Sequence, residues 1–437
     1  MSAINSSYYI VKYGYINIEE GDKMEDRKIR FGLNYVPSKK WAYSWMDWDR
    51  TSIFNDLKAI SSIGMDHIRI HLLWPYFQPN NNYVSEVCLD RLSELLDLAD
   101  SCNLDVAVTV LDGWLCGYPF YTTWKKERNI FTDPLMISAE KLLFTKIAQK
   151  IGEHKRFLGF DIGNELDVLN FCGCPITLEE GDAWHSEMIS HCEEIAPNKF
   201  HVSGLDHIPW FNNIGFSRPA ISNTGSATAL HAWIAFTDAM KYYKPMESGS
   251  VNLAEFFIEM ANAYSNDINR PVWMQEFGAS DLWMSDEEKL EFAEKTILNA
   301  AGCKNVWGFT WWCSHDIDRS FEGFDPLEYE MGIFDVNNNI KPIGTKLAQI
   351  IRNFRNNAPK IENKYAALVL PEDVFITEPD KQNTVSNPLW AFARKFFKLI
   401  DEGIKPLIVL ECKIDDKEYL ASRGIKELII FNMCGGL

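Results

Sequence analysis

The sequence predicts an α/β protein whose larger part is a barrel of eight parallel strands, each followed by a helix. From about residue 30 to residue 355, short apolar runs alternate with longer amphipathic segments. The runs are hydrophobic enough to be buried on both faces, as the strands of a parallel sheet are. There are eight of them, which is the count of a (β/α)8 TIM barrel. A doubly wound sheet could also use eight strands, but no glycine-rich nucleotide-binding turn follows the first one.

The expected strands are separated by segments with helical periodicity. In chain order the strands cover residues 30–36, 66–73, 104–111, 157–164, 199–205, 229–234, 271–277 and 305–312. Apolar residues at helical spacing indicate helices between most of them, among them residues 49–63, 89–99, 137–151 and 287–301. Gly64 ends the first of these helices.

A second, smaller α/β unit is expected after Pro359. Strands at 365–371, 405–411 and 426–432 alternate there with helices at 388–403 and 417–424. This is a βαβαβ pattern of doubly wound type, without residues that suggest chemistry, so we expect a structural role or a homo-oligomer contact. The predicted domains are an N-terminal extension (1–29), the barrel (30–358) and the C-terminal α/β domain (359–437).

The N-terminal segment does not resemble a secretion signal. Residues 1–23 lack a basic region, a continuous apolar run and a small-residue cleavage site, and Met24 begins a more usual N-terminus. We therefore expect residues 1–23 to be an upstream extension with no role in the fold. No window reaches the roughly 20 apolar residues that a membrane-spanning helix requires. A cytoplasmic protein is the expectation.

Charge and cysteine content exclude several classes of partner. Lys and Arg number 43 against 61 Asp and Glu, which gives a net charge of −18, and no long basic run occurs. Nucleic acids and anionic membranes are therefore not expected as partners. The ten cysteines form no regular framework. Cys172, Cys174, His191 and Cys192 could hold a metal, but CxxC pairs are missing, and we favour reduced thiols and no metal.

Two carboxylates stand at the ends of expected strands. The fourth strand ends in Asn164 and Glu165, and the seventh ends in Gln275 and Glu276. A barrel of this kind carries its chemistry at the carboxyl ends of its strands, so both glutamates should face the same mouth. Glycoside hydrolysis needs such a pair, one acid to protonate the leaving oxygen and one carboxylate to attack the anomeric carbon.

Other strand ends add polar and aromatic groups to this mouth. Each has a simpler alternative: a structural ion pair for the arginine, a core position for the histidine and packing for the tryptophans. Together with the two glutamates they favour a site. These residues are Arg69 in strand two, His231 and Trp233 in strand six, and Trp311 and Trp312 in strand eight.

Longer segments resemble a known family. "HIRIHLLW", "GNEL", "WMQEFGAS" and "GFTWWCSHD" resemble family 5 of the clan A glycoside hydrolases, over residues 31 to about 355. "FGLNYVPSKKWAYSWMDWD", "LLWPYFQPN" and "WWCSHDIDRSFEGFDPLEYEMGIFD" are similar to its subgroup of β-mannosidase and endo-β-mannanase-like enzymes. The resemblance implies a TIM barrel, an oligosaccharide substrate, a retaining mechanism, and neither a metal nor an organic cofactor.

The resemblance also implies roles for the polar residues. Glu165 would be the general acid/base and Glu276 the nucleophile. Asn164 would hold the 2-hydroxyl of the reacting sugar, a contact that strengthens in the transition state. Arg69 would keep Glu276 ionised and oriented.

His231, Trp311 and Trp312 would line the sugar subsite, with one of the two tryptophans as its floor and the other as packing. One position departs from the family. Strand six commonly carries His-x-Tyr, whose tyrosine donates a hydrogen bond to the nucleophile, but this chain has "HAW" with Trp233 in that place. The indole N–H could donate instead, or another residue could supply the bond.

The main expectation is a β-mannosidase that acts on short mannosides. On the same barrel, a β-glucosidase, a β-1,4-glucanase or an endo-β-1,4-mannanase is the alternative, and an inactive carbohydrate-binding protein is an alternative of another class. The connection at residues 313–339 is long and rich in aromatic and acidic residues. It could wall off the groove and leave a pocket for chain ends, or it could only pack against the C-terminal domain.

Overall fold

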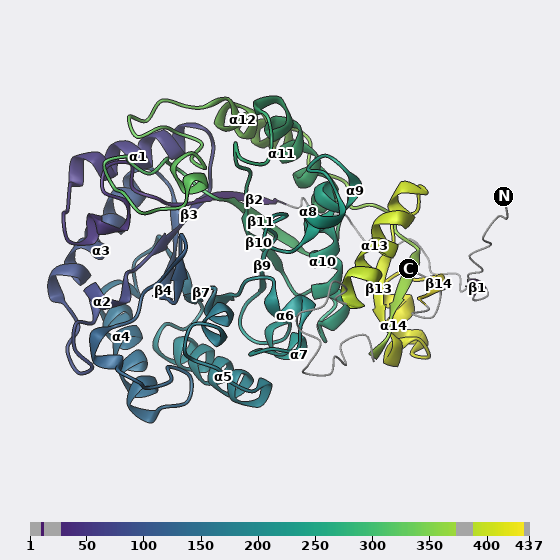
Figure 1. Cartoon of the computed structure of the whole chain (residues 1–437), viewed down its shortest axis with the longest axis horizontal. Helices are drawn as coiled ribbons and strands as arrows, with labels where there is room; N and C mark the ends of the chain where they lie inside the picture. Colours follow the sequence, from purple (N-terminus) through teal and green to yellow (C-terminus); the bar gives the residue numbers. More distant parts are fainter. Residues whose placement is uncertain (1–9, 13–27, 373–387, 432–437) are drawn as a thin grey trace.

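The larger sheet is the expected barrel. The computed structural model describes residues 10–12, 28–372 and 388–431. Eight strands, all paired in parallel, follow the order β8-β7-β4-β3-β2-β11-β10-β9, and the two end strands lie next to each other, so the barrel is nearly closed (Figure 1). The strands are β2 (Arg30–Asn34), β3 (His67–His71), β4 (Asp105–Asp112), β7 (Phe157–Asn164), β8 (Val202–Gly204), β9 (Thr228–His231), β10 (Val272–Phe277) and β11 (Val306–Trp311). Each overlaps one of the eight predicted runs, which confirms the fold.

Amphipathic helices surround the strands and begin at clear capping residues. Asp49 accepts hydrogen bonds from the backbone N–H of Thr51 and Ser52 at the start of α1, and Thr177 and Ser285 form capping boxes at α5 and α11. The long helices of the barrel are α1 (Arg50–Ser62), α3 (Glu86–Ser101), α4 (Pro134–Ile151), α5 (Leu178–Ile195), α10 (Leu253–Tyr264), α11 (Asp286–Ala301) and α12 (Pro342–Asn356).

The smaller C-terminal sheet has helices on both faces. β12 (Ala366–Leu370) lies between β13 (Leu407–Leu410) and β14 (Glu427–Ile430) and is parallel to both. Side chains of β12 alternate: Leu368 packs in the same cluster as α13 (Pro388–Asp401), whereas Val369 packs with Leu420 of α14 (Lys417–Ser422). This alternation is the doubly wound arrangement that the βαβαβ pattern predicts.

One strand of this sheet comes from the other end of the chain. β1 (Ile10–Lys12) pairs antiparallel with β14, with Val11 opposite Leu428. The pattern of residues 1–23 did not suggest a strand. The pairing gives this segment backbone contacts with the C-terminal sheet. That residues 1–23 are not needed for the fold stays a prediction, and deleting these residues would test it.

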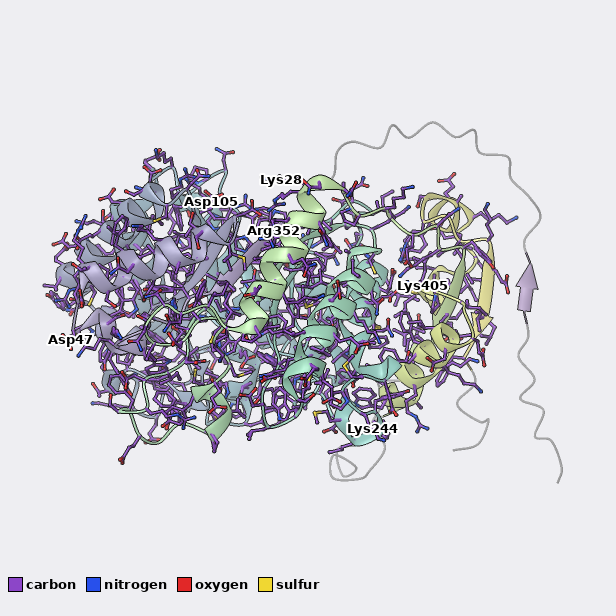
Figure 2. All side chains as sticks on the ribbon, turned by 90° about the horizontal axis from the view of Figure 1, so that it is seen from above. Lys28, Asp47, Asp105, Lys244, Arg352 and Lys405 are labelled. Carbon is purple, nitrogen blue, oxygen red and sulfur yellow. The ribbon has the colours of Figure 1, made fainter. Side chains whose placement is uncertain are left out.

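The two sheets share one hydrophobic core. Along the long axis of the molecule the smaller sheet lies beside the barrel (Figure 2). Phe256 of α10 contacts Phe396 and Phe397 of α13, with ring centroids 5.4 and 5.7 Å apart. Phe211 stacks on Trp390 at 5.0 Å. None of the helices in the described ranges is long and apolar enough to cross a membrane.

Candidate active site

The two glutamates meet at the barrel mouth. Asn164 ends β7 and Glu165 follows it, while Glu276 lies in β10 and His231 ends β9. One carboxylate oxygen of Glu165, one ring nitrogen of His231 and one carboxylate oxygen of Glu276 lie within 4.8 Å of one another. The predicted strand ends are therefore brought together in space.

Arg69 joins the floor of this site. Its side chain is fully buried. Nε donates to Asp161 at 2.8 Å, one terminal nitrogen donates to Glu276 Oε1 at 2.6 Å, and the other donates to Asn164 Oδ1 at 2.7 Å. A buried guanidinium is tolerated only when it is paired and fully hydrogen-bonded, and Asp161 and Glu276 supply the compensating charges.

Both oxygens of the Glu276 carboxylate accept hydrogen bonds. Oε1 is held by Arg69, and Oε2 accepts from the indole Nε1–H of Trp233 at 3.3 Å. His231 Nδ1 lies 3.5 Å from the same Oε2. The strand-six position that departs from the family pattern thus contacts the glutamate through its indole, which is the first of the two options that the sequence left open.

Glu165 has an unusual backbone conformation and a raised pKa. Its φ of 48° and ψ of 42° are left-handed, and its backbone N–H donates to the carbonyl of Gly204 at 2.7 Å. Its Oε1 is hydrogen-bonded to His231 Nδ1 at 2.9 Å. Burial, followed by the negative charges of Asp206 and Glu276, raises the pKa of Glu165 well above the ordinary value. Burial and these charges favour the protonated form of the Glu165 carboxyl.

Three residues beside Glu165 were missed by the sequence analysis. His207 Nδ1 lies 2.8 Å from Asp206 Oδ2, and the backbone N–H of Asp206 donates to Asp167 Oδ1 at 2.9 Å. Burial opposes the ionisation of Asp206, but the charge and hydrogen bond of His207 outweigh it and lower the pKa of Asp206. Burial and the Asp206 charge raise the pKa of Asp167 to about 7. No motif marks this trio, because its members follow two different strands.

The two adjacent tryptophans have different surroundings. Trp312 packs in the aromatic cluster of the mouth, together with Trp41 and Trp233. Trp311 packs against Phe277 in the main core, with ring centroids 5.0 Å apart. Of the two, Trp312 is therefore the one that faces the site.

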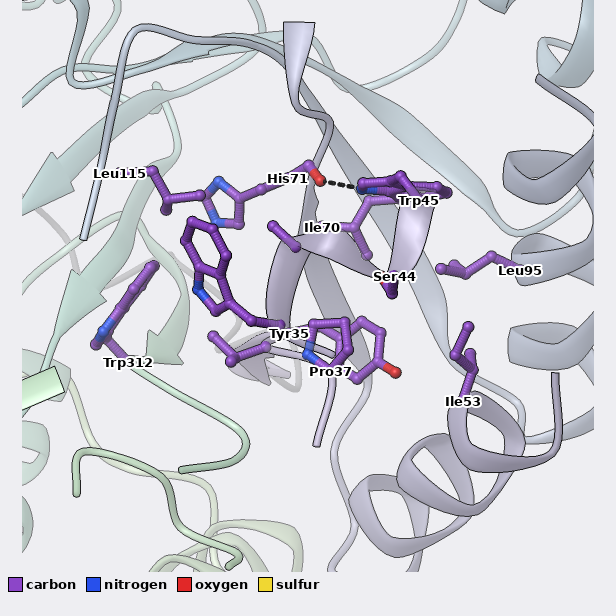
Figure 3. Close-up of a pocket in the computed structure, with 13 residues that line it drawn as sticks. Tyr35, Pro37, Ser44, Trp45, Ile53, Ile70, His71, Leu95, Leu115 and Trp312 are labelled. Atoms are coloured by element: carbon purple, nitrogen blue, oxygen red, sulfur yellow. Dashed lines mark hydrogen bonds between the residues drawn. The ribbon is translucent and has the colours of Figure 1, made fainter. Parts of the chain in front are cut away.

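A His71–Asp112 pair also lies at the mouth and was not predicted. His71 Nδ1 is 2.9 Å from Asp112 Oδ1, and the ring of His71 meets Trp312 edge-on at 5.7 Å. Figure 3 shows the His71 ring on the Leu115 and Trp312 side of a small cavity of about 20 Å³. Within the described chain, His71 Nε2 and Asp112 Oδ2 are buried without a hydrogen-bond partner. They leave hydrogen-bonding capacity for a hydroxylated ligand.

The long connection after β11 covers one side of the mouth. Phe324 contacts Trp41 at 4.9 Å and Tyr118 at 5.6 Å, and Phe321 contacts Tyr43 at 5.5 Å. The connection therefore packs on the loops that follow β2 and β4, so the alternative that it packs only against the C-terminal domain is wrong. It also brings Glu328 to Cys116 and Trp312, and burial raises the pKa of Glu328 to about 7.

The barrel mouth also holds side chains that are close enough together to bind a metal ion. Over the described ranges, Glu165, His231 and Glu276 are the one group of three or more candidate ligands found close enough to hold an ion. The segment with Cys172, Cys174, His191 and Cys192 forms no such group, and the cysteines of the described chain are free thiols.

Comparison with known proteins shows that the chain is similar to members of one enzyme family. The family model described as cellulase, glycosyl hydrolase family 5, matches residues 34–316, well over half of the chain. A GH5_18 enzyme of Streptomyces cattleya, solved in complex with Manβ1-4GlcNAc, is 31% identical, with 92% of this chain and 99% of that chain covered and a TM-score of 0.86. A GH5_18 enzyme of Bifidobacterium longum subsp. longum, also solved with Manβ1-4GlcNAc, is 30% identical over 92% and 96%, with a TM-score of 0.84.

An exo-β-1,4-mannosidase of Opitutaceae bacterium strain TAV5 shares the fold at 23% identity, over 88% of this chain and 70% of that chain, with a TM-score of 0.76. No match was found among curated protein sequences. The chain has a parallel barrel with two adjacent carboxylates at its mouth, and it is similar to known glycosidases. These observations together identify it as a glycoside hydrolase. The chain belongs to glycosyl hydrolase family 5.

Proposed function

We propose that this enzyme is a retaining β-mannosidase that removes a terminal mannose from short β-mannosides by double displacement. The observation that carries the mechanism is the approach of a Glu165 oxygen and a Glu276 oxygen to within 4.8 Å. Retaining enzymes hold their two carboxyl groups about 5–5.5 Å apart, whereas inverting enzymes need roughly 6.5–9.5 Å to admit a water molecule between carboxylate and sugar.

In the first step Glu276 attacks the anomeric carbon as Glu165 gives its proton to the glycosidic oxygen. The bond from carbon to the leaving oxygen breaks, and an ester forms between the sugar and Glu276. Arg69 and Trp233 fix the two oxygens of Glu276, so the attack needs little reorganisation. The raised pKa of Glu165 supports its role as the acid.

In the second step Glu165, now a carboxylate, takes a proton from water, and the water oxygen attacks the anomeric carbon. The ester breaks and Glu276 leaves as a carboxylate, so the product keeps the β configuration. Asn164 is placed to hold the 2-hydroxyl: its Oδ1 accepts from Arg69, and its Nδ2 has a second hydrogen beyond the one donated to the Trp114 carbonyl. Trp312 would be the floor under the sugar.

Two observations support a short mannoside as substrate. The relatives from Streptomyces cattleya and Bifidobacterium longum were solved with a disaccharide in which mannose is β-linked to N-acetylglucosamine. The contacts of Phe321 and Phe324 with the neighbouring loops close one side of the mouth. A closed side suits the non-reducing end of a chain and disfavours internal cuts.

Azide rescue tests the roles of the two glutamates. Glu165→Ala should still form the glycosyl-enzyme from substrates with good leaving groups, and azide should then accelerate the second step and give a β-mannosyl azide. Glu276→Ala should form no glycosyl-enzyme, and azide should give at most the α-mannosyl azide. The opposite pattern would reverse the assignment.

Aryl β-mannoside, β-glucoside and β-galactoside substrates test the sugar preference, and we expect the highest kcat/KM for the mannoside. The early products from β-1,4-mannohexaose test the mode of cleavage. Release of single mannose units supports the proposal. A spread of mannobiose and mannotriose, or a higher kcat/KM for the glucoside, would contradict it in favour of a mannanase or a glucanase.

A further inference from the structure

Three possible ligand atoms converge at the barrel mouth. His231 Nδ1 lies 2.9 Å from Glu165 Oε1 and 3.5 Å from Glu276 Oε2. The oxygens of the two glutamates are at most 4.8 Å apart. A proton on Glu165 can lie between that oxygen and His231, but it leaves Glu276 Oε2 out. A metal ion can contact all three atoms at once.

The hydrogen bonds of the His231 ring point its lone pair at the two glutamates. Nε2 of His231 lies 3.0 Å from Gln275 Oε1, and the amide nitrogen of Gln275 donates to Asp161 at 3.4 Å. An amide oxygen only accepts, so Nε2 carries the ring hydrogen and Nδ1 keeps its lone pair. Metal-binding histidines have this arrangement, in which the other ring N–H donates to an acceptor that fixes the ring.

The charges around the three atoms favour a cation. The negative charges of Asp206 and Glu276 act on Glu165. Arg69 bonds to Glu276 through Oε1, whereas Oε2 is the oxygen beside His231. The oxygen that would contact an ion is therefore not the one that the guanidinium occupies, and a positive charge placed there is attracted by both glutamates.

We propose that Glu165, His231 and Glu276 bind a Zn²⁺ ion, and that this ion inhibits the enzyme by competing with the substrate. The inference concerns regulation of the same site and rests on the proposed function for the roles of the two glutamates. One imidazole and two carboxylates suit Zn²⁺, which commonly takes three protein ligands and leaves a fourth position to water. Mg²⁺ and Ca²⁺ prefer oxygen ligands alone.

The geometry needs only a small adjustment. Tetrahedral Zn²⁺ with bonds of about 2.1 Å spaces neighbouring ligand atoms roughly 3.4 Å apart. The separation of His231 Nδ1 and Glu276 Oε2 already fits, and Glu165, whose side chain is the most exposed of the three, must move toward Glu276. The ion replaces the proton of Glu165, which is released to water, and occupies an oxygen of Glu276. Neither glutamate can then act on a sugar, so the ion is an inhibitor and not a cofactor.

Calorimetric titration with zinc chloride tests the site without requiring turnover. The full chain should carry Cys412→Ser, because Cys412 is an exposed thiol that could itself bind zinc. We expect one ion per chain, and Glu165→Gln in this background should weaken binding about 100-fold, since even loss of an outer hydrogen-bond partner of a ligand costs roughly 10–100-fold. Glu328→Gln is the matched control, because Glu328 is an acid of the same mouth outside the group and its loss should leave the affinity nearly unchanged. Equal affinities of the two variants, or no binding at all, would overturn the proposal.

Inhibition kinetics test the competition with substrate. For an aryl β-mannoside, Zn²⁺ should raise KM and leave kcat unchanged, and an excess of chelator should restore the original KM. Mg²⁺ and Ca²⁺ at the same concentration should have no effect. A fall in kcat at unchanged KM would mean that the ion acts elsewhere and would overturn the proposal. If the aryl β-mannoside is not cleaved at all, the proposed β-mannosidase is refuted, and the calorimetric result still decides on the zinc site.

Discussion

The carboxylate of Glu276, the proposed nucleophile, is held by donors from two distant strands. Arg69 comes from β3 and Trp233 follows β9, and each occupies one oxygen of Glu276. The arginine bond is short and charge-assisted, whereas the indole bond, at 3.3 Å, is long. Arg69 therefore fixes the position of the carboxylate, and Trp233 sets the direction in which Oε2 points. If Glu276 is the nucleophile, the indole N–H should therefore contribute measurably to catalysis.

Replacing Trp233 with phenylalanine should remove that hydrogen bond while keeping an aromatic ring. We expect kcat for an aryl β-mannoside to fall ~10-fold, which is less than the 10²–10³ lost with a well-placed donor, because the bond is long. Trp311→Phe is the control, because the buried Nε1 of Trp311 has no partner in the described part of the chain. Equal losses in the two variants, measured per folded molecule, would show that packing and not the N–H is responsible.

The pH dependence of the enzymatic activity should depend on the charge of Asp206. In the proposed mechanism Glu165 must be protonated for the first step, so activity should fall as pH rises through the pKa of Glu165. Burial raises that pKa first, and the Asp206 charge raises it further. In Asp206→Asn the added charge is gone, the pKa of Glu165 falls, and the alkaline limb of the kcat/KM profile should move to lower pH. Asp105→Asn, at the opposite end of the barrel, should leave the limb in place, and a shift of the Asp206→Asn limb to higher pH would contradict the argument.

Sequence patterns located some of these residues and not others for a physical reason. Glu165 and Glu276 end apolar strands of a parallel barrel, and such strand ends always meet at one mouth. The partners of Asp112 and Asp206 depend on side-chain directions after the strands end, which no local pattern encodes. The left-handed backbone of Glu165 was equally invisible, because glutamate gives no signal for a positive φ.

Among the elements, the strands were the most predictable part. All eight barrel strands and the three parallel strands of the small sheet lie within or across the predicted ranges, because burial on both faces leaves continuous apolar runs. β1 was missed, since a three-residue edge strand has too little pattern, and its pairing with β14 joins segments more than 400 residues apart.

A buried acid between two helices gives a prediction at the scale of elements. Glu140 of α4 accepts a hydrogen bond from the Trp184 indole of α5 at 3.0 Å, and its other oxygen has no partner in the described chain. Burial raises the pKa of Glu140 to about 8. The folded state therefore binds this proton more tightly than the unfolded chain, so the group's contribution to stability is present at low pH and is lost as pH rises toward 8.

Glu140→Gln should remove this pH dependence, because a glutamine stays neutral and can still accept from Trp184. We expect the melting temperature to rise by about 3 °C at pH 8 and to change little at pH 5. Glu193→Gln, at an exposed position of α5, is the matched control and should have no effect at either pH. A destabilised Glu140→Gln at pH 8 would mean that the ionised form makes favourable contacts.

For the whole molecule, the contact between barrel and C-terminal sheet combines aromatic packing with buried charges. Lys364, which precedes β12, donates to Glu255 and Glu259 of α10 at 2.6 and 2.9 Å. Arg423, after α14, lies 3.5 Å from Glu259. These charged side chains are buried at the interface. If the small sheet separated from the barrel, the ion pairs between them would be broken and ions on both sides would lose their partners. The barrel and the smaller sheet should therefore unfold together.

If the two parts unfold together, calorimetry should give one unfolding transition for the wild type. The substitution Lys364→Met leaves two buried carboxylates without their cation, so it should lower the stability of the whole molecule by about 3–5 kcal/mol. Burial already raises the pKa of Glu255, and loss of Lys364 raises it further, so the carboxyl takes up a proton on folding and the destabilisation should be larger at pH 8 than at pH 5. Lys405→Met is the control, since Lys405 pairs with Glu362 at a partly exposed position and should contribute about 0–1 kcal/mol. Two separate transitions in the wild type, or equal effects of the two substitutions, would show that the small sheet folds as an independent unit.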